Sequence, residues 1–335
     1  VRVDTWDGFI FYTMNDKAPE LLEYLDPLPE IYKNHNFKDQ IRAQWVRVEL
    51  DVNWKFFCDN FNESYHTRFV HPQVPSVIDQ DHFTSRYEMF PKGHARIIQM
   101  GRPSLRDRVH EGEDHPFQGI LEDWGVDTSK YKDYEALSEQ GWIDLKKAKR
   151  KNYKEKGYHH YENLSDEELT ESPFQFIFPN IAMGVQADGC ILLNWFPHPT
   201  DPEKCYFDLW DMGYPIGGSA KGIGKTGRDT DEEFKSTSAG IGETGRTSNQ
   251  EYFSRTKVNP IILQEVELDF RDYDNGKGVE DLWDHVVYQD WQLTDGLRRG
   301  VRSRGYQEPY LASQETRVRF FHEKLHDYLN GNPPK

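Results

Sequence analysis

The chain has 335 residues, of which 36% are hydrophobic and 14% aromatic, enough for one large folded domain or two smaller ones. Its formal net charge of −16 excludes nucleic acid and anionic membrane surfaces as main partners, because both would repel it. The three cysteines form no CxxC pair, and no apolar run approaches the roughly 20 residues that span a bilayer. These features predict a folded cytoplasmic protein with no membrane partner.

The N-terminal part predicts two strands on either side of a short helix. Trp6 to Met14 reads as strand, and Gln44 to Val52 alternates as a half-buried strand does. Ala18 to Asp26 has the spacing of an amphipathic helix, with Pro19 in its first turn. The segment Asn53 to His71 follows the second strand directly. We therefore expect the densest group of reactive side chains to lie where a strand passes into a helix.

The middle of the chain predicts an antiparallel sheet interrupted by helical sequence. Residues 82–100 contain two expected strands, and residues 117–171 are polar and helix-permissive. Within that stretch, residues 146–156 are expected to be a solvated helix face instead of a binding patch, because acidic residues dilute the charge. Three consecutive antiparallel strands are expected at Phe174 to Val185, Gly189 to Pro197 and Cys205 to Trp210.

The C-terminal part predicts two amphipathic helices, at Val279 to Gly300 and Ser313 to Leu329. The second helix carries an apolar side made of Val318, Phe321, Leu325 and Leu329. Strands in the middle and a long closing helix indicate an α+β domain.

A glycine-rich stretch between the sheet and these helices comes close to a phosphate-binding loop. Ser219 to Thr226 nearly matches G-x-x-x-x-G-K-[ST], and Gly222 to Arg228 is repeated at Gly240 to Arg246. The stretch neither follows an apolar strand nor opens an apolar helix, so nothing aims its N–H groups at a phosphate. We interpret it as a surface insertion.

The segment Asn53 to Pro72 contains two histidines, His66 and His71, separated by four residues. Two imidazoles and one carboxylate on one face of an octahedron bind Fe(II) and leave positions free for oxygen and substrate. A separation of five residues turns the second side chain by about 140° on a regular helix. Both histidines can therefore reach one ion only if the helix ends or bends near Phe69, and Pro72 favours such an ending.

Two histidines at this spacing could also be ordinary half-buried side chains. Glu63 lies three residues before His66, and Asn60 three before Glu63, so the three project along one helix side. Glu63 can then orient His66 through a hydrogen bond, as histidines that bind metals usually require. The joint pattern indicates a metal site more specifically than either histidine does.

These residues, with Asn53-Trp54-Lys55 before them, give the chain a resemblance to the Rieske ring-hydroxylating oxygenases. Residues 6–11 (WDGFIF), the segment 178–180 (FPN) on a central strand and the C-terminal helix pair extend the resemblance. It implies that His66 and His71 bind a mononuclear Fe(II) ion and that a late helical aspartate completes the site. Asp290 is the best match, with Asp284 as the alternative, because Asp295 and Arg298 depart from the family pattern.

The resemblance also implies roles for two further residues and a fold. Glu63 matches the carboxylate that links the iron histidine to a cluster histidine of a neighbouring subunit, and Asn60 is expected to tune the site. The implied fold is a helix-grip domain of the START-like (SRPBCC) type, with a curved antiparallel sheet around a long C-terminal helix. Residues 1–40 would follow a preceding Rieske domain and pack on a catalytic domain at 41–335, which has inserts near 112–170 and 215–255.

The chain itself has no Rieske motif, because no cysteine has a histidine at the C-x-H or C-x-x-H spacing. The resemblance therefore implies a [2Fe-2S] cluster on a domain that precedes Val1, or a form that has lost it. Electrons would come from NAD(P)H through a reductase, with or without a ferredoxin. The relay between subunits implies a homotrimer or a trimer-based hexamer.

Three functions are compatible with the pattern. The favoured one is O₂-dependent mono- or dihydroxylation of an organic substrate, which the aromatic content suggests to be an apolar ring. A zinc hydrolase with Glu63 as base would use the same residues but lacks an H-E-x-x-H signature. A START-like binding module would use the histidines only to line a pocket. Metal content distinguishes the three.

Overall fold

The computed structural model describes residues 1–108, 115–214, 265–268, 285–307 and 310–333. The phosphate-loop match at Ser219 to Thr226, the glycine-rich repeats, the second insert and Asp284 lie outside these residues. Within the described residues, no helix combines the length and the apolar character that crossing a membrane requires.

Strands and helices of the described residues bear out most of the expected elements. The strands are β1 (Arg2–Trp6), β2 (Phe9–Thr13), β3 (Ile41–Leu50), β4 (Arg86–Met89), β5 (Ala95–Met100), β6 (Glu171–Ile177), β7 (Ile181–Gln186), β8 (Gly189–Pro197), β9 (Cys205–Gly213) and β10 (Glu265–Leu268). The helices are α1 (Leu21–Leu25), α2 (Leu28–Ile31), α3 (Trp54–Phe61), α4 (Thr67–Val70), α5 (Pro116–Asp123), α6 (Tyr134–Asn152), α9 (His285–Val301) and α10 (Thr316–Leu329). The helix expected at Ala18 to Asp26 is shorter and begins after Pro19.

One eight-stranded sheet organises the molecule, in the order β10-β3-β9-β8-β7-β6-β5-β4. In this order, every neighbouring pair from β3 through β9, β8, β7, β6 and β5 to β4 is antiparallel. Strand β10 pairs with β3 in parallel at the edge of the sheet. The expected single strand at Phe174 to Val185 is wrong, because it is two strands joined by a turn at residues 178–180. Pro179 has no N–H to donate to a sheet ladder, which favours a turn there. The fold is thus α+β with a mainly antiparallel sheet.

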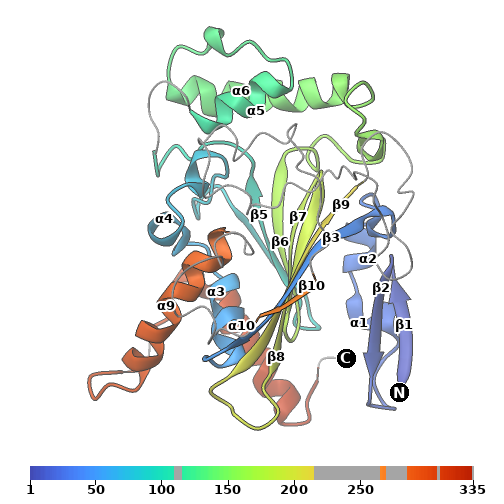
Figure 1. The fold of residues 1–335 in the computed structure, drawn as a ribbon, viewed down its shortest axis with the longest axis vertical. Helices are drawn as coiled ribbons and strands as arrows, with labels where there is room; N and C mark the ends of the chain where they lie inside the picture. Colours follow the sequence, from blue (N-terminus) through green and yellow to red (C-terminus); the bar gives the residue numbers. More distant parts are fainter. Residues whose placement is uncertain (109–114, 215–264, 269–284, 308–309, 334–335) are drawn as a thin grey trace.

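Each face of the sheet is covered by a different part of the chain (Figure 1). On one face, α3 and α10 pack over Phe176, Leu193 and Phe207. On the other, the β1–β2 hairpin, α1 and α2 pack over Met183 and Leu192. Neighbouring residues of one strand thus enter different cores, because successive side chains point to opposite faces.

The last helix carries the apolar side that the sequence predicts, with one exception. Val318 and Phe321 are buried, and Leu325 packs against the same core. Leu329, the fourth residue of that side, is 78% exposed and does not enter the core. Tyr328 stacks on Phe178 at 4.9 Å between ring centroids, and the last turn therefore packs through Tyr328.

Helices α5 and α6 form a separate layer above one end of the sheet (Figure 1). Their apolar side chains, Phe117, Leu121 and Leu145 among them, have their own core together with Val74 and Leu169. The expectation that residues 146–156 form only a solvated helix face is wrong at Lys149. This side chain is buried, and its Nζ donates to the Leu169 carbonyl at 2.8 Å.

Because His94 is buried as a neutral ring, we predict that acid destabilises the fold. Its Nε2 donates to the Tyr24 carbonyl at 2.7 Å and its Nδ1 accepts from the Phe178 amide at 3.1 Å, so the neutral ring is fully used. Burial, helped by Lys92 and opposed by the Tyr24 carbonyl, lowers the pKa of His94 from 6.5 to about 4. Between these pH values the unfolded chain binds the proton and the folded chain does not, so stability falls as pH falls.

We expect this histidine to contribute a loss of about 3 kcal/mol in unfolding free energy between pH 7 and pH 4. Urea unfolding at several pH values across that range would measure this loss. The His94→Gln variant should show a smaller decrease of unfolding free energy with falling pH. An unfolding free energy that stays constant from pH 7 to pH 4 would contradict the assignment.

Candidate metal centre and its cavity

The segment that carries the two histidines leaves the sheet in a short, interrupted helical path. At the end of β3, the Asn53 side chain caps α3 by accepting from the Lys55 amide at 3.1 Å. Helix α3 ends at Phe61, and the next helix, α4, contains only residues 67–70. His66 and His71 are the residues at its two ends. The expected end of the helix near Phe69 is confirmed, because α4 ends at Val70, and it lets both rings turn toward one point.

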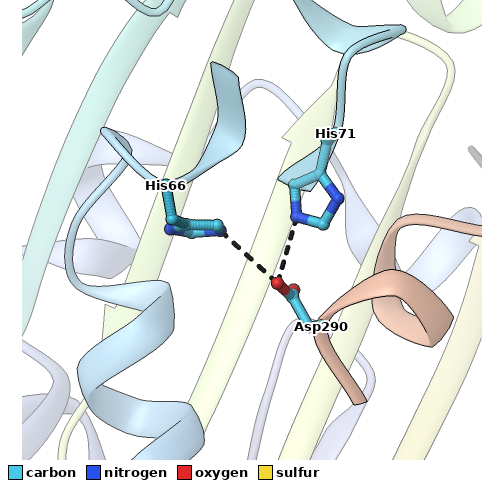
Figure 2. A group of neighbouring side chains, drawn as sticks. All are labelled: His66, His71 and Asp290. Atoms are coloured by element: carbon cyan, nitrogen blue, oxygen red, sulfur yellow. Dashed lines mark ion pairs between the residues drawn. The ribbon is translucent and has the colours of Figure 1, made fainter. Parts of the chain in front are cut away.

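His66, His71 and Asp290 come together although Asp290 lies on α9, more than two hundred residues later (Figure 2). The three ligand atoms lie within 4.8 Å of one another. The Nε2 atoms of His66 and His71 are 3.6 and 3.1 Å from Asp290 Oδ1. Ligands at right angles with bonds of about 2.1 Å are about 3 Å apart, so the spacing is close to that of three neighbouring positions around one ion.

Glu63 orients the first histidine as the sequence predicts. One of its carboxylate oxygens contacts His66 Nδ1, and the other accepts from the His66 backbone N–H at 3.2 Å. Because a carboxylate only accepts, Nδ1 carries the proton, and Nε2 faces Asp290 as the unprotonated nitrogen that can bind a metal. Burial disfavours the charged ring, but the hydrogen bond and charge of Glu63, aided by Asp290, raise the pKa of His66. The site therefore favours a positive charge at its centre.

Gln289 orients the second histidine, and the sequence assigned it no role. Its Oε1 lies 2.8 Å from His71 Nδ1 and also accepts from Gln73 Nε2 at 2.8 Å. His71 Nδ1 is consequently the protonated nitrogen, and Nε2 is the free one. The only signal in the sequence was that Gln289 stands next to Asp290, which does not show the direction of its side chain.

Asn60 reaches into the same group from α3. Its Nδ2 donates to Asp290 Oδ1 at 3.2 Å and lies 3.4 Å from His66 Nε2. All five residues that the sequence singled out are thus in one cluster. Asn60 holds the aspartate oxygen that faces both histidines.

These residues fit a bound divalent metal ion. His71 is 1% exposed, and its Nε2 makes no hydrogen bond to any group in the described part of the chain. A buried nitrogen without a partner is costly, and a metal ion would satisfy it. Two neutral imidazoles and a carboxylate form the donor set of non-haem Fe(II) sites.

A cavity of about 200 Å³ opens beside the three residues. Its walls near the centre are apolar and include Phe57, Phe61, Leu193, Trp195 and Phe207. Farther along, residues of the α5–α6 layer line it, among them Phe117, Trp124 and Lys149. The insert expected near 112–170 therefore supplies part of the wall, which sequence patterns did not indicate.

Comparison with known families identifies one match that covers well over half of the chain. The model of the ring hydroxylating alpha subunit, catalytic domain, matches residues 37–215 and 269–331. The match runs without a break through residues 112–170, which the sequence suggested to be an insert. Residues 6–11, which extended the sequence resemblance, lie outside it.

Two curated proteins are similar over shorter stretches. The alpha subunit of 2-aminobenzenesulfonate 2,3-dioxygenase from Alcaligenes sp. is 25% identical over 29% of this chain and 25% of its own length. The oxygenase subunit of carnitine monooxygenase from Acinetobacter pittii (strain PHEA-2) is 27% identical over 33% of this chain and 32% of its own.

The solved structure of a quaternary ammonium Rieske monooxygenase has a similar fold. It superposes with a TM-score of 0.52 at 15% identity and covers 98% of this chain. The chain spans 61% of the length of that protein.

Proposed function

Since this chain belongs to the ring-hydroxylating alpha subunit family through its catalytic domain, we propose that it is the oxygen-activating part of a Rieske-type non-haem iron oxygenase. The reaction would be O₂-dependent hydroxylation, with one or two oxygen atoms inserted. The observation that carries the proposal is the convergence of His66 Nε2, His71 Nε2 and an Asp290 oxygen within 4.8 Å.

His66, His71 and Asp290 are the proposed iron ligands. When bound there, Fe(II) would supply the chemistry that activates O₂ for insertion into a C–H bond or addition to a ring carbon. Glu63 and Gln289 hold the two rings with Nε2 toward the centre, and Asn60 keeps the Asp290 carboxylate in place. The apolar wall beside the centre excludes water and positions a substrate ring there.

Glu63 is also the proposed link to the electron donor. We propose that a Rieske [2Fe-2S] cluster of a neighbouring subunit, in a homotrimer or trimer-based hexamer, supplies the electrons. They would come from NAD(P)H through a reductase, with or without a ferredoxin. Residues 1–40 would connect the cluster-bearing domain to the catalytic domain at 41–335, and the whole would work in the cytoplasm.

The helix-grip form of the fold is part of the same proposal. Helix α10 lies on the sheet face that also carries α3, with Phe321 against Phe176 and Phe178. A sheet that holds its C-terminal helix in this way is what the START-like class predicts. The wall beside the centre supports an apolar or aromatic ring as the substrate body.

Iron stoichiometry tests the proposed function. The chain, purified without oxygen and given equimolar Fe(II) and Zn(II) in turn, should bind about one Fe(II) ion, and His66→Ala should lose it. A chain that binds only Zn(II) would favour the hydrolase, and a chain that binds neither would favour the binding module. Either result would overturn the oxygenase proposal.

Gln289→Leu is expected to weaken Fe(II) binding about tenfold or more, because loss of a partner that orients a ligand histidine typically costs this much. Competition with a metal chelator would measure the dissociation constant. Gln73→Leu is the matched control, since among the described residues the Gln73 side chain hydrogen bonds to Gln289 and to none of the three proposed ligands. Equal losses in both variants would show that Gln289 acts only through general packing.

A further inference from the structure

The sheet face that lines the cavity changes character along the strands. One apolar level of this face consists of Ile97 on β5, Phe174 on β6 and Ile191 on β8, all lining the cavity. Phe61, which follows Asn60 in α3, contacts Phe174 with 5.8 Å between ring centroids. This level therefore contacts α3 at the residue next to Asn60, which belongs to the candidate iron site.

Two residues farther along each strand, the same face becomes polar. Gln99 on β5 pairs with Ser172 on β6, and Gln186 on β7 donates from Nε2 to Ser172 Oγ at 3.4 Å. All three line the cavity. Side chains two residues apart on a strand share one face and are about 7 Å apart along it. The polar level thus lies one step beyond the apolar one as seen from the centre.

Gln99 is a buried amide whose side chain has no hydrogen-bond partner among the described residues. It is 1% exposed, and neither its Nε2 nor its Oε1 hydrogen bonds to any group in the described part of the chain. Thr170, which immediately precedes β6, is 6% exposed, lines the same cavity and has an Oγ1 without a described partner. Buried polar groups in native proteins are nearly always hydrogen-bonded, so these atoms indicate a ligand group.

The charges around the cavity restrict what that group can be. Lys149 and Lys156 lie 5.7 and 5.5 Å from the centroid of the Trp124 ring, which lines the cavity. Two acidic residues, Asp123 and Glu171, also line the cavity, so away from the metal centre the lining charges balance and favour an uncharged ligand group. Glu171 pairs with Arg86 at 3.0 Å, and Asp123 Oδ2 is buried without a hydrogen-bond partner among the described residues. A carboxylate ligand would leave Gln99 Oε1 without a donor, because a carboxylate only accepts.

Resting on the proposed function, we propose that the substrate is an apolar ring bearing an uncharged group that both donates and accepts hydrogen bonds, of the carboxamide type. The ring lies against Ile97 and Phe174 near the metal centre. The amide binds Gln99 through both its N–H and its carbonyl, with Thr170 as the second partner. Gln99 and Thr170 are then specificity-determining residues, because a plain hydrocarbon would leave their buried polar atoms unpaired.

Equilibrium dialysis of the Fe(II)-loaded chain against matched naphthalene probes tests the proposal. Wild type should bind 2-naphthamide about tenfold or more tightly than 2-methylnaphthalene or 2-naphthoate, since an unpaired buried partner costs this much or more. Gln99→Leu should reduce the preference for the amide to within about twofold. Its melting temperature should not fall, because an apolar side chain of similar size replaces an unpartnered amide.

Ile97→Val is the matched control on the same strand face. This substitution should weaken the binding of 2-naphthamide and of 2-methylnaphthalene by similar factors, because Ile97 contacts only the apolar ring of the proposed substrate. A Gln99→Leu chain that keeps the amide preference, or a wild type that prefers 2-naphthoate, would overturn the proposal. Iron content measured on the same samples separates the two claims, since a wild type that holds no iron contradicts the proposed function whichever probe it binds.

Discussion

Asp290→Ala is expected to weaken Fe(II) binding by more than about a hundredfold, because even a change outside the ligand set costs about ten- to a hundredfold. The carboxylate is the one negative group that faces both histidine Nε2 atoms, at 3.6 and 3.1 Å, among the described residues. Its loss removes a ligand and leaves the buried His71 Nε2 without a nearby charge. Anaerobic titration with a competing chelator would measure the change.

Asp295→Ala provides the matched control for that experiment. Asp295 lies on the same helix, α9, is 53% exposed and pairs with Arg298 and Arg299. Its removal should leave Fe(II) binding unchanged and the fold intact by circular dichroism. If Asp290→Ala also retains iron while His66→Ala loses it, the third ligand is another residue. Asp284, the alternative that the sequence left open, would then be tested next.

Phe321→Ala is expected to destabilise the fold by about 3–5 kcal/mol, the usual cost of emptying a fully packed phenylalanine site. Phe321 is 1% exposed and contacts Trp54, Phe176 and Phe178, so it connects α10 with α3 and the central strands. Chemical unfolding would measure the free energy. Because α3 leads into the histidine segment, the loss should also weaken metal binding.

Leu329→Ala is the control on the same helix. This residue is 78% exposed, and a substitution there should change the unfolding free energy by no more than about 0.5 kcal/mol. Comparable losses at both positions would mean that the last turn of α10 packs as the sequence suggested. A small effect at Phe321 would contradict the core described for that face of the sheet.

The local pattern of the chain was sufficient for most elements. Alternation identified β3, apolar strand-like character identified β8 and β9, and amphipathic spacing identified α10, because each of these signals lies within a single segment. Two errors have different causes. The turn at residues 178–180 has a local signal, Pro179, which argued against one continuous strand. Leu329 has helical spacing but is exposed, and that depends on how distant parts of the chain pack.

The candidate site divides in the same way. Asn60, Glu63 and His66 lie within seven residues of sequence, and His71 follows five residues later. Their spacing and the break in the helix could therefore be inferred locally. Asp290 was selected by resemblance to a family motif, since no local property distinguishes it from Asp284 or Asp295. Its position beside both histidines depends on how α9 packs against α3 and α4, which is a property of the tertiary structure.

The sequence by itself therefore determined an acidic α+β chain with a histidine motif suited to a metal and a resemblance to ring-hydroxylating oxygenases. Only the tertiary structure decided which carboxylate joins the motif, that Gln289 orients His71, and that Gln99 and Thr170 are buried beside the cavity. The physical reason is that these relations depend on strand register and helix packing. Both are set by contacts between residues far apart in the chain, and such contacts leave no period in the local sequence.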